Sequence, residues 1–311
     1  MSMSSNEIEL LDGKLVAENP PASAVLSRLN DYFQLTKPRI VLLELIVAAA
    51  TACIAAPHAI DAVVLFHALA GTALVAGSAS MGNQLIERNI DAHMPRTAQR
   101  PLPAGRITIW ETALLCMLTL CLGTLWLVLK VNLLTAVLGL ASWIIYVVIY
   151  TPLKTRTPLN TAVGALAGAL PLLMGWTATG QPLTLTAYAL AGVLFLWQFP
   201  HFMAIAWIYR EDYGKAGHKM LSVVDPSGWR CGLQAIVGAL FLIPVSLIPA
   251  VLPAGRSPIS YSLWAIGLGG IILALSVRFA FERDDRTARQ LLKATLIYLP
   301  AWMGVLLMVS L

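Results

Sequence analysis

The chain has 311 residues, of which 58% are hydrophobic and only 12% are charged, and its mean hydropathy is +0.75. Soluble domains carry about 25% charged residues, so this composition excludes an ordinary soluble protein and indicates one that spans a membrane. The net charge of +5 comes without a nucleic-acid-binding motif, and we therefore expect no nucleic-acid partner.

Residues 1–36 are polar and rich in acids. They contain Glu7, Glu9, Asp12 and Glu18 against Lys14 and Arg28. No apolar run follows a basic start, so we expect no signal peptide, and the acids argue against a mitochondrial transit peptide. We predict a disordered cytosolic tail over 1–36 and one membrane domain over 37–311.

Nine apolar runs follow, each with the roughly 17 to 25 residues that cross a hydrocarbon core about 30 Å thick. They lie at 40–57, 62–85, 111–129, 132–151, 160–177, 185–208, 232–252, 261–281 and 291–310. Only residues 130–132 separate the third run from the fourth. The pattern predicts an all-α polytopic bundle of nine transmembrane helices.

Positive charge predicts the orientation of this bundle. With a cytosolic N-terminus, the tail and the loops after spans 2, 4, 6 and 8 hold every Lys and Arg residue except Lys130 and Arg256. Cytosolic loops carry such an excess. We therefore predict an N-in, C-out protein with cytosolic active-site loops 2–3 and 6–7.

The second span ends in the stretch NQLIERNID. Its Asn83, Glu87 and Asp91 are spaced i, i+4, i+8 and share one face of a helix. Magnesium binds through one or two carboxylates together with water and phosphate oxygens. We therefore predict that this face binds a divalent cation.

The 2–3 loop that follows is rich in arginine. Its guanidinium groups match phosphate oxygens in geometry, and the group consists of Arg88, Arg96, Arg100 and Arg106. Acids that bind a metal beside arginines that bind phosphate indicate a diphosphate substrate. The alternative is a solvated interfacial loop in which positive-inside arginines pair with carboxylates.

Two further loops carry unusual residues. In the 6–7 region His201 and Asp212 are eleven residues apart, which places them on one face if the helix is continuous. The alternative is a structural histidine and a capping aspartate. In the 4–5 loop Tyr150 and Lys154 are four apart and Arg156 follows, so a phenol and two cations can reach the same phosphates. A plain positive-inside turn is the alternative there.

At these motifs the sequence resembles the protoheme IX farnesyltransferase (heme O synthase) family, a branch of the intramembrane aromatic prenyltransferase superfamily. The stretches that carry the resemblance are NQLIERNIDAHMPRTAQRPL from Asn83, YTPLKTRT from Tyr150, WQFPHF from Trp197 and REDYGKAGHKML from Arg210, together with NTAVGALAGALPLLMGW over 160–176. The resemblance runs from about residue 35 to the end. The combination of RTxxRPL, WQxPHF and DYxxAG is specific to the heme branch.

The resemblance implies roles for these residues. Asn83, Glu87 and Asp91 correspond to the first acid motif and Asp212 to the second, and together they would hold Mg²⁺. The implied catalytic residues are Asp91, Asp212, Lys154 and Tyr150. Diphosphate would be bound by Arg88, Arg96, Arg100, Lys154 and Tyr150. The sequence departs from the family pattern where Glu87 replaces the commoner Asp, where Asn89 replaces an acid, and at His218–Lys219, where an apolar residue and proline are common.

The implied activity is transfer of the farnesyl group of farnesyl diphosphate to a vinyl group of heme b, with addition of water, to give heme O. The implied place is a bacterial cytoplasmic (inner) membrane, with membrane lipid around the protein and a heme-A synthase or terminal oxidase as an assembly partner. His201 is open to four roles: heme iron ligand, donor to a heme propionate, orienter of a metal-bound water, or structural histidine. Glu44, an acid inside the first span, is a further functional candidate, with Lys37 or Arg39 as its partner.

Two other functions are open from the sequence. One is a prenyltransferase of the same superfamily that acts on a quinone precursor or a chlorophyll-type acceptor, against which the stretch WQFPHF speaks. The other is a nine-span transporter whose acids bind a cation. Transporters place such residues near the midplane of broken helices, whereas here they gather at one end of the spans.

Overall fold

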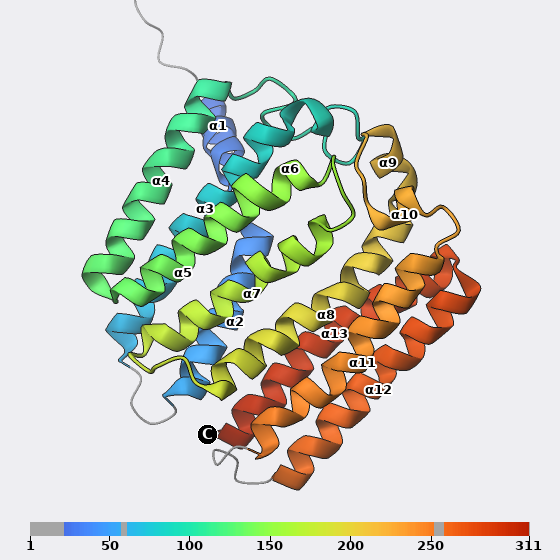
Figure 1. The fold of residues 1–311 in the computed structure, drawn as a ribbon. Helices are drawn as coiled ribbons and strands as arrows, with labels where there is room; N and C mark the ends of the chain where they lie inside the picture. Colours follow the sequence, from blue (N-terminus) through green and yellow to red (C-terminus); the bar gives the residue numbers. More distant parts are fainter. Residues whose placement is uncertain (1–21, 57–60, 252–257, 311) are drawn as a thin grey trace, which may run out of the picture.

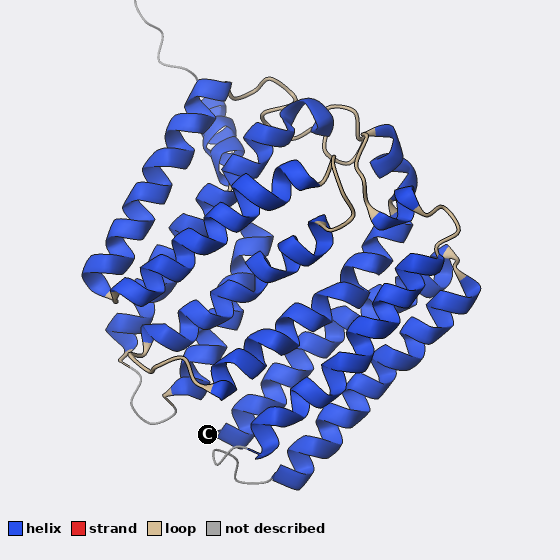
Figure 2. Cartoon of the chain, viewed as in Figure 1, coloured by secondary structure: helices blue, strands red, loops and turns tan. Residues whose placement is uncertain are grey.

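The structure is a computed structural model, and it describes residues 22–56, 61–251 and 258–310. Within these ranges every regular element is a helix (Figures 1 and 2). Nine segments of this part of the chain are long and apolar enough to cross a membrane, which confirms the predicted number. Eight are the helices α2 (Pro38–Ala55), α3 (Ala62–Asp91), α4 (Ile109–Lys130), α7 (Asn160–Ala178), α8 (Leu185–Ile208), α11 (Trp229–Val251), α12 (Pro258–Glu282) and α13 (Asp285–Ser310).

The fourth span changes its helix type along its length. It begins as α5 (Leu133–Trp143), continues as the π-helix η1 (Ile144–Tyr150) and ends as one turn of α-helix, α6 (Thr151–Leu153). Asn132 caps its start by accepting a hydrogen bond from the amide of Thr135 at 2.8 Å, so spans 3 and 4 separate where the sequence predicts. The π segment was not predicted, because periodicity alone does not distinguish it from an α-helix.

The predicted disordered tail is wrong over its second half. Residues 1–21 lie outside the described residues, but Ala22–Leu35 form the helix α1. This helix is held to the membrane domain because Arg28 pairs with Glu111 of α4, and Asp31 accepts from Arg106 at 3.0 Å. Leu35 at its end is fully buried. Tertiary contacts therefore order a polar segment that composition alone assigns to a tail.

The spans form a closed arrangement around α7. Helix α7 packs against α2, α5 and α8, and α13 contacts both α8 and α2, so the first and last spans meet. At Gly175 of α7 a Cβ atom would lie 2.0 Å from the carbonyl oxygen of Ala48, so only glycine allows α2 to approach this closely. Small residues therefore set the packing of the central helix.

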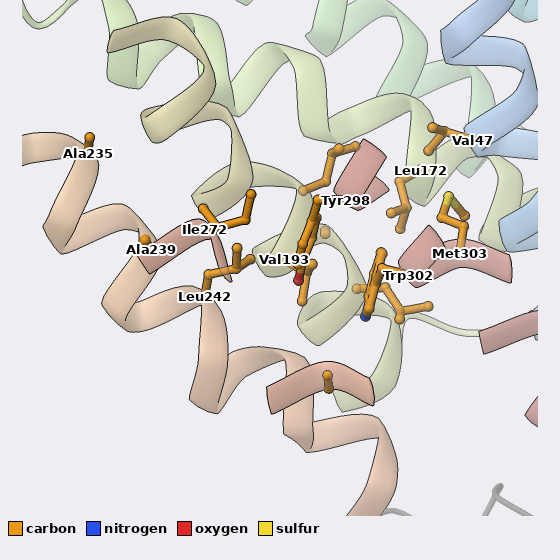
Figure 3. Close-up of a cluster of buried hydrophobic side chains, with 14 of the residues drawn as sticks. Val47, Leu172, Val193, Ala235, Ala239, Leu242, Ile272, Tyr298, Trp302 and Met303 are labelled. Atoms are coloured by element: carbon orange, nitrogen blue, oxygen red, sulfur yellow. The ribbon is translucent and has the colours of Figure 1, made fainter. Parts of the chain in front are cut away.

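Most of the buried apolar side chains lie in the C-terminal half of the bundle. Figure 3 shows Val193, Leu242, Ile272, Tyr298 and Trp302 gathered between α8, α11, α12 and α13. Trp302 donates to the hydroxyl of Tyr261, which donates to the carbonyl of Ser246. The polar atoms of Trp302 and Tyr261 are therefore paired. This core holds the four C-terminal spans together.

The loops after spans 2, 4 and 6 meet at that polar end. Two short helices, α9 (Arg210–Lys215) and α10 (Leu221–Val224), form the 6–7 region (Figure 1). The amide of Lys219 donates to the carbonyl of Lys154 at 2.6 Å, and Arg210 pairs with Asp285 of α13 at 2.7 Å. The start of the last span therefore lies at the same end, as the alternating topology predicts.

Candidate active site

A small polar cavity of about 90 Å³ opens where these loops meet. It is lined by Lys37, Asn83, Glu87, Asp91, Met94, Arg96, Thr97, Arg100, Tyr150, Lys154, Tyr213, His218 and Met220. These residues come from four separate stretches of the chain, at 37, 83–100, 150–154 and 213–220, and four of the residues are cationic. The structure therefore brings residues of the 2–3, 4–5 and 6–7 regions to one cavity.

Helix α3 supplies the acidic wall of the cavity. The side chains of Asn83, Glu87 and Asp91 line it together and are 0%, 4% and 1% exposed, as their shared helix face predicts. The Asn83 amide donates to Glu87 at 2.9 Å and to the hydroxyl of Thr151 at 3.1 Å. At the end of α3, Thr97 donates to the carbonyl of Asp91 at 2.8 Å and turns the loop back over the cavity.

Both buried carboxylates have a cationic partner. Lys154 lies 2.8 Å from Glu87, and Arg100 lies 2.6 Å from Asp91. A buried charge is costly unless it is paired, so these ion pairs offset part of the cost of burying the two acids. Burial alone would lower the pKa of Lys154, but the neighbouring Tyr150 and Glu87 outweigh it and the pKa lies above its ordinary value.

The π-helix places Tyr150 and Lys154 in the cavity. The Lys154 ammonium lies 4.7 Å from the centre of the Tyr150 ring. This ring packs directly on Gly164 of α7, where a Cβ atom would lie 2.7 Å from Cε2 of Tyr150. π-helical turns are rare and often occur at functional sites. Here the wider turn and the short helix after it bring a phenol and an ammonium to the same cavity.

Lys37 lines the cavity, although the sequence predicted for it only a positive-inside charge and a candidate pairing with Glu44. It immediately precedes Pro38 and has a left-handed backbone with φ of 52°. Its ammonium donates to the Asn83 side chain at 2.5 Å. Burial, with the nearby cations Arg100 and Lys154, lowers the pKa of Lys37 to about 7. Its position directly before the first span was the only signal in the sequence.

The arginines of the 2–3 loop divide into three groups. Arg96 and Arg100 line the cavity, and Arg96 also lies over the ring of Tyr209 at 4.8 Å. Arg88 does not line it and donates to the carbonyl of Leu85 at 2.7 Å. Arg106 anchors the loop to α1 through Asp31. Of the three arginines predicted to bind diphosphate, the structure therefore brings two to the cavity.

The predicted common helix face of His201 and Asp212 is wrong. Helix α8 ends at Ile208, and Tyr209 leaves the helical region with φ of −107° and ψ of 20° before α9 begins. The eleven-residue spacing therefore does not correspond to three regular turns. The half-buried Asp212 does not line the cavity, whereas its neighbour Tyr213 does.

His201 lies against the last span, away from the cavity-lining residues. Its Nδ1 is 3.0 Å from the hydroxyl of Thr295 on α13, and its ring stacks on Trp197 at 4.8 Å. Trp197 in turn donates to the carbonyl of Thr295 at 2.8 Å. These contacts fix the imidazole and leave Nε2 as the nitrogen that a ligand would meet.

The donor set of the cavity fits a hard divalent cation. Carboxylate and amide oxygens are the ligands that magnesium takes, and it keeps other positions for water and phosphate. Asn83, Glu87 and Asp91 supply these oxygens from one face. In the part of the chain that the structure describes, no group of three or more His, Cys, Asp or Glu side chains is placed to hold a metal ion, so the amide of Asn83 is needed beside the two carboxylates.

Comparison with known proteins gives one consistent family. A sequence model of the UbiA prenyltransferase family matches residues 45–299. The chain is 42% identical over 274 residues to a protoheme IX farnesyltransferase from Rhodopirellula baltica. The matched region covers 86% of this chain and 96% of that protein. The fold of this chain is similar to two solved structures. One is a digeranylgeranylglyceryl phosphate synthase, with a TM-score of 0.78, 15% identity and coverage of 91% of this chain and 99% of that one. The other is a UbiA homologue from Archaeoglobus fulgidus bound to GPP and Mg²⁺, with a TM-score of 0.65, 19% identity and coverage of 89% and 99%.

Proposed function

Because the chain belongs to the UbiA prenyltransferase family, we propose that it transfers the farnesyl group of farnesyl diphosphate to a vinyl group of heme b and gives heme O. The observation that carries the proposal is the cavity in which buried acids of α3 face cations from three other segments. The relative from Rhodopirellula baltica is named as a protoheme IX farnesyltransferase. This supports heme b as the acceptor and argues against a quinone-type acceptor.

The diphosphate head of the substrate fits the polar cavity. Asn83, Glu87, Asp91 and Asp212 would hold Mg²⁺, which when bound neutralises charge on the diphosphate and helps it to leave. Of these, Asp212 is the ligand supplied by the 6–7 loop, next to the cavity residue Tyr213. The Mg²⁺ in the homologue from Archaeoglobus fulgidus supports the same requirement here.

The protein's own cations stabilise the leaving group. Arg96, Arg100, Lys154 and the hydroxyl of Tyr150 supply donors to the negative charge that develops as the C–O bond breaks. In the free protein Lys154 and Arg100 neutralise Glu87 and Asp91. A diphosphate therefore meets donors that are already charged and positioned, so little reorganisation is needed.

The farnesyl chain and the porphyrin would lie among the spans. The allylic carbon adds to the vinyl group of heme b, water adds to the resulting porphyrin-side cation, and a proton is released, so that diphosphate and heme O are the products. The apolar walls exclude water until the carbon–carbon bond has formed. His201 is the proposed heme contact, because Thr295 holds Nδ1 and leaves Nε2 for a ligand.

The proposal places the protein as an integral multi-pass protein of the bacterial cytoplasmic membrane, with N-in, C-out orientation, as the charge distribution supports. Its product would pass to a heme-A synthase or a terminal oxidase. The decisive experiment is mass spectrometry of hemes extracted from heme-O-deficient membranes before and after expression of this chain. Heme O must appear, and a prenylated quinone precursor in its place would overturn the acceptor assignment.

A further inference from the structure

His218 is a cavity residue that the site described so far does not use. It follows α9 and Gly217, whose φ of +73° reverses the chain. Its own amide donates to the carbonyl of Tyr213 at 2.9 Å. The next residue, Lys219, donates its amide to the carbonyl of Lys154 at 2.6 Å. The backbone on both sides of His218 is therefore fixed, and its imidazole lies in the cavity wall.

The imidazole of His218 is buried, and one of its two nitrogens has no polar partner. His218 is 3% exposed, and its Nδ1 has no hydrogen-bond partner. The ring of Tyr213 meets it edge-on at 5.7 Å, which is an apolar contact. Burying a polar nitrogen without a partner costs free energy, so such a group in a cavity indicates that a ligand supplies the partner.

The surroundings of His218 select the kind of ligand. The carboxylates of Glu87 and Asp91 are already paired with Lys154 and Arg100. Four cations line the cavity, and a proton on Nδ1 of His218 would add a directional donor to this positive wall. Magnesium prefers oxygen to imidazole nitrogen. An anion with several oxygens is therefore the partner that the wall fits.

We propose that His218 donates a hydrogen bond directly to the diphosphate group of the prenyl substrate, and to the diphosphate product, from the 6–7 region of the cavity wall. The inference rests on the proposed function and deepens it by naming a further binding residue. The family pattern implied by the sequence has an apolar residue at this position, so the contact adds a donor that the pattern did not predict.

Binding measurements on the full-length protein in detergent with Mg²⁺ test this proposal. Calorimetric Kd values for inorganic diphosphate and for farnesyl diphosphate are compared in the wild type, His218→Met and His218→Gln. Gln and Met have similar shapes, but only Gln has a donor. His93→Leu is the control, because His93 lies in the 2–3 loop, is exposed and does not line the cavity.

We expect His218→Met to raise both Kd values about tenfold, which corresponds to about 1.4 kcal/mol. His218→Gln should raise them less than threefold, and His93→Leu should leave them unchanged. The KM for farnesyl diphosphate should rise in the same proportion, while the KM for heme stays within twofold. A general loss of structure would instead raise both KM values.

Wild-type Kd values for both diphosphates in His218→Met would overturn the proposal, as would equal weakening by Met and Gln. If His218→Met does not fold, as judged by its thermal transition, His218→Ala replaces it with the same expectation. Normal diphosphate binding by the wild type without heme O formation would overturn the proposed acceptor and leave the His218 contact standing. The two failures are therefore distinguishable.

Discussion

Gly164 of α7 gives the sharpest test of how the cavity is built. An alanine Cβ at this position would lie 2.7, 3.0 and 3.1 Å from three carbon atoms of the Tyr150 ring. Ordinary contact begins at 3.4 Å, so the ring must move by about 0.7 Å. The ring also supports the Lys154 ammonium at 4.7 Å. The displacement therefore reaches the cation that pairs with Glu87.

Two magnitudes follow from this displacement. Overpacking a well-packed site costs about 1–3 kcal/mol in the free energy of unfolding. Misplacement of a reacting group by about 1 Å costs on the order of 100-fold in rate. We therefore expect Gly164→Ala to fold with a lowered thermal transition and to lose about 10- to 100-fold in kcat/KM for farnesyl diphosphate.

The assay is heme O formation by the purified protein, with the thermal transition measured in parallel. Gly267→Ala in α12 is the matched control, because no atom lies within 4 Å of its new Cβ, and it should retain full activity. The reasoning is tested by Gly164→Ala in a Tyr150→Ala background, where the ring is absent. If the alanine costs as much activity there as in the wild type, the clash with Tyr150 is not the cause.

Four further outcomes are expected. Asp91→Asn should lower heme O formation on the order of 100-fold, because a proposed metal ligand is lost and Arg100 loses its partner; unchanged product yield would remove the metal assignment. Lys154→Met should lower stability by about 3 kcal/mol, since it leaves Glu87 buried without a cation, and the double variant with Glu87→Gln should recover the thermal transition but not the activity. Glu44→Gln should lower the rate only a few-fold. The charge near Glu44 is Lys37, whose ammonium donates its hydrogen bond to Asn83 and not to Glu44. A total loss of activity would give Glu44 a direct role. Removal of Mg²⁺ by chelation should abolish transfer and leave the thermal transition nearly unchanged, since Lys154 and Arg100 already neutralise the acids; a large drop in that transition would show that the metal is structural.

Much of the fold is predictable from the sequence because hydrocarbon thickness fixes the length of each span. All nine predicted runs correspond to helices of the structure. The face formed by Asn83, Glu87 and Asp91 was also predictable, because it lies on one uninterrupted helix. The same argument failed for His201 and Asp212, where Tyr209 interrupts the helix. Periodicity assumes regular backbone, and nothing in the local sequence marks this break.

Other parts of the site depend on contacts between distant segments. Arg88 and Arg96 look alike in the sequence, but only Arg96 reaches the cavity. Helix α1 is ordered by its contacts with Glu111 and Arg106, which follow it by more than seventy residues. Lys37 and His218 enter the cavity because of turns with left-handed backbone at Lys37 and Gly217. Such placements follow from packing and turn geometry, which composition and spacing do not encode.

The π-helical segment has a consequence for how the fourth span tolerates change in length. Removing one residue from Ile144–Tyr150 would tighten the wide turn into an ordinary α-helix, and because a π-turn holds one more residue than an α-turn, the later residues would keep nearly the same facing relative to α5. The deletion would still leave 20 of the 21 residues of Leu133–Leu153, enough to cross the bilayer. The shortened protein would insert as before with its phenol and ammonium still facing the cavity, whereas a deletion in the regular helix α5 would turn both side chains away by about 100°.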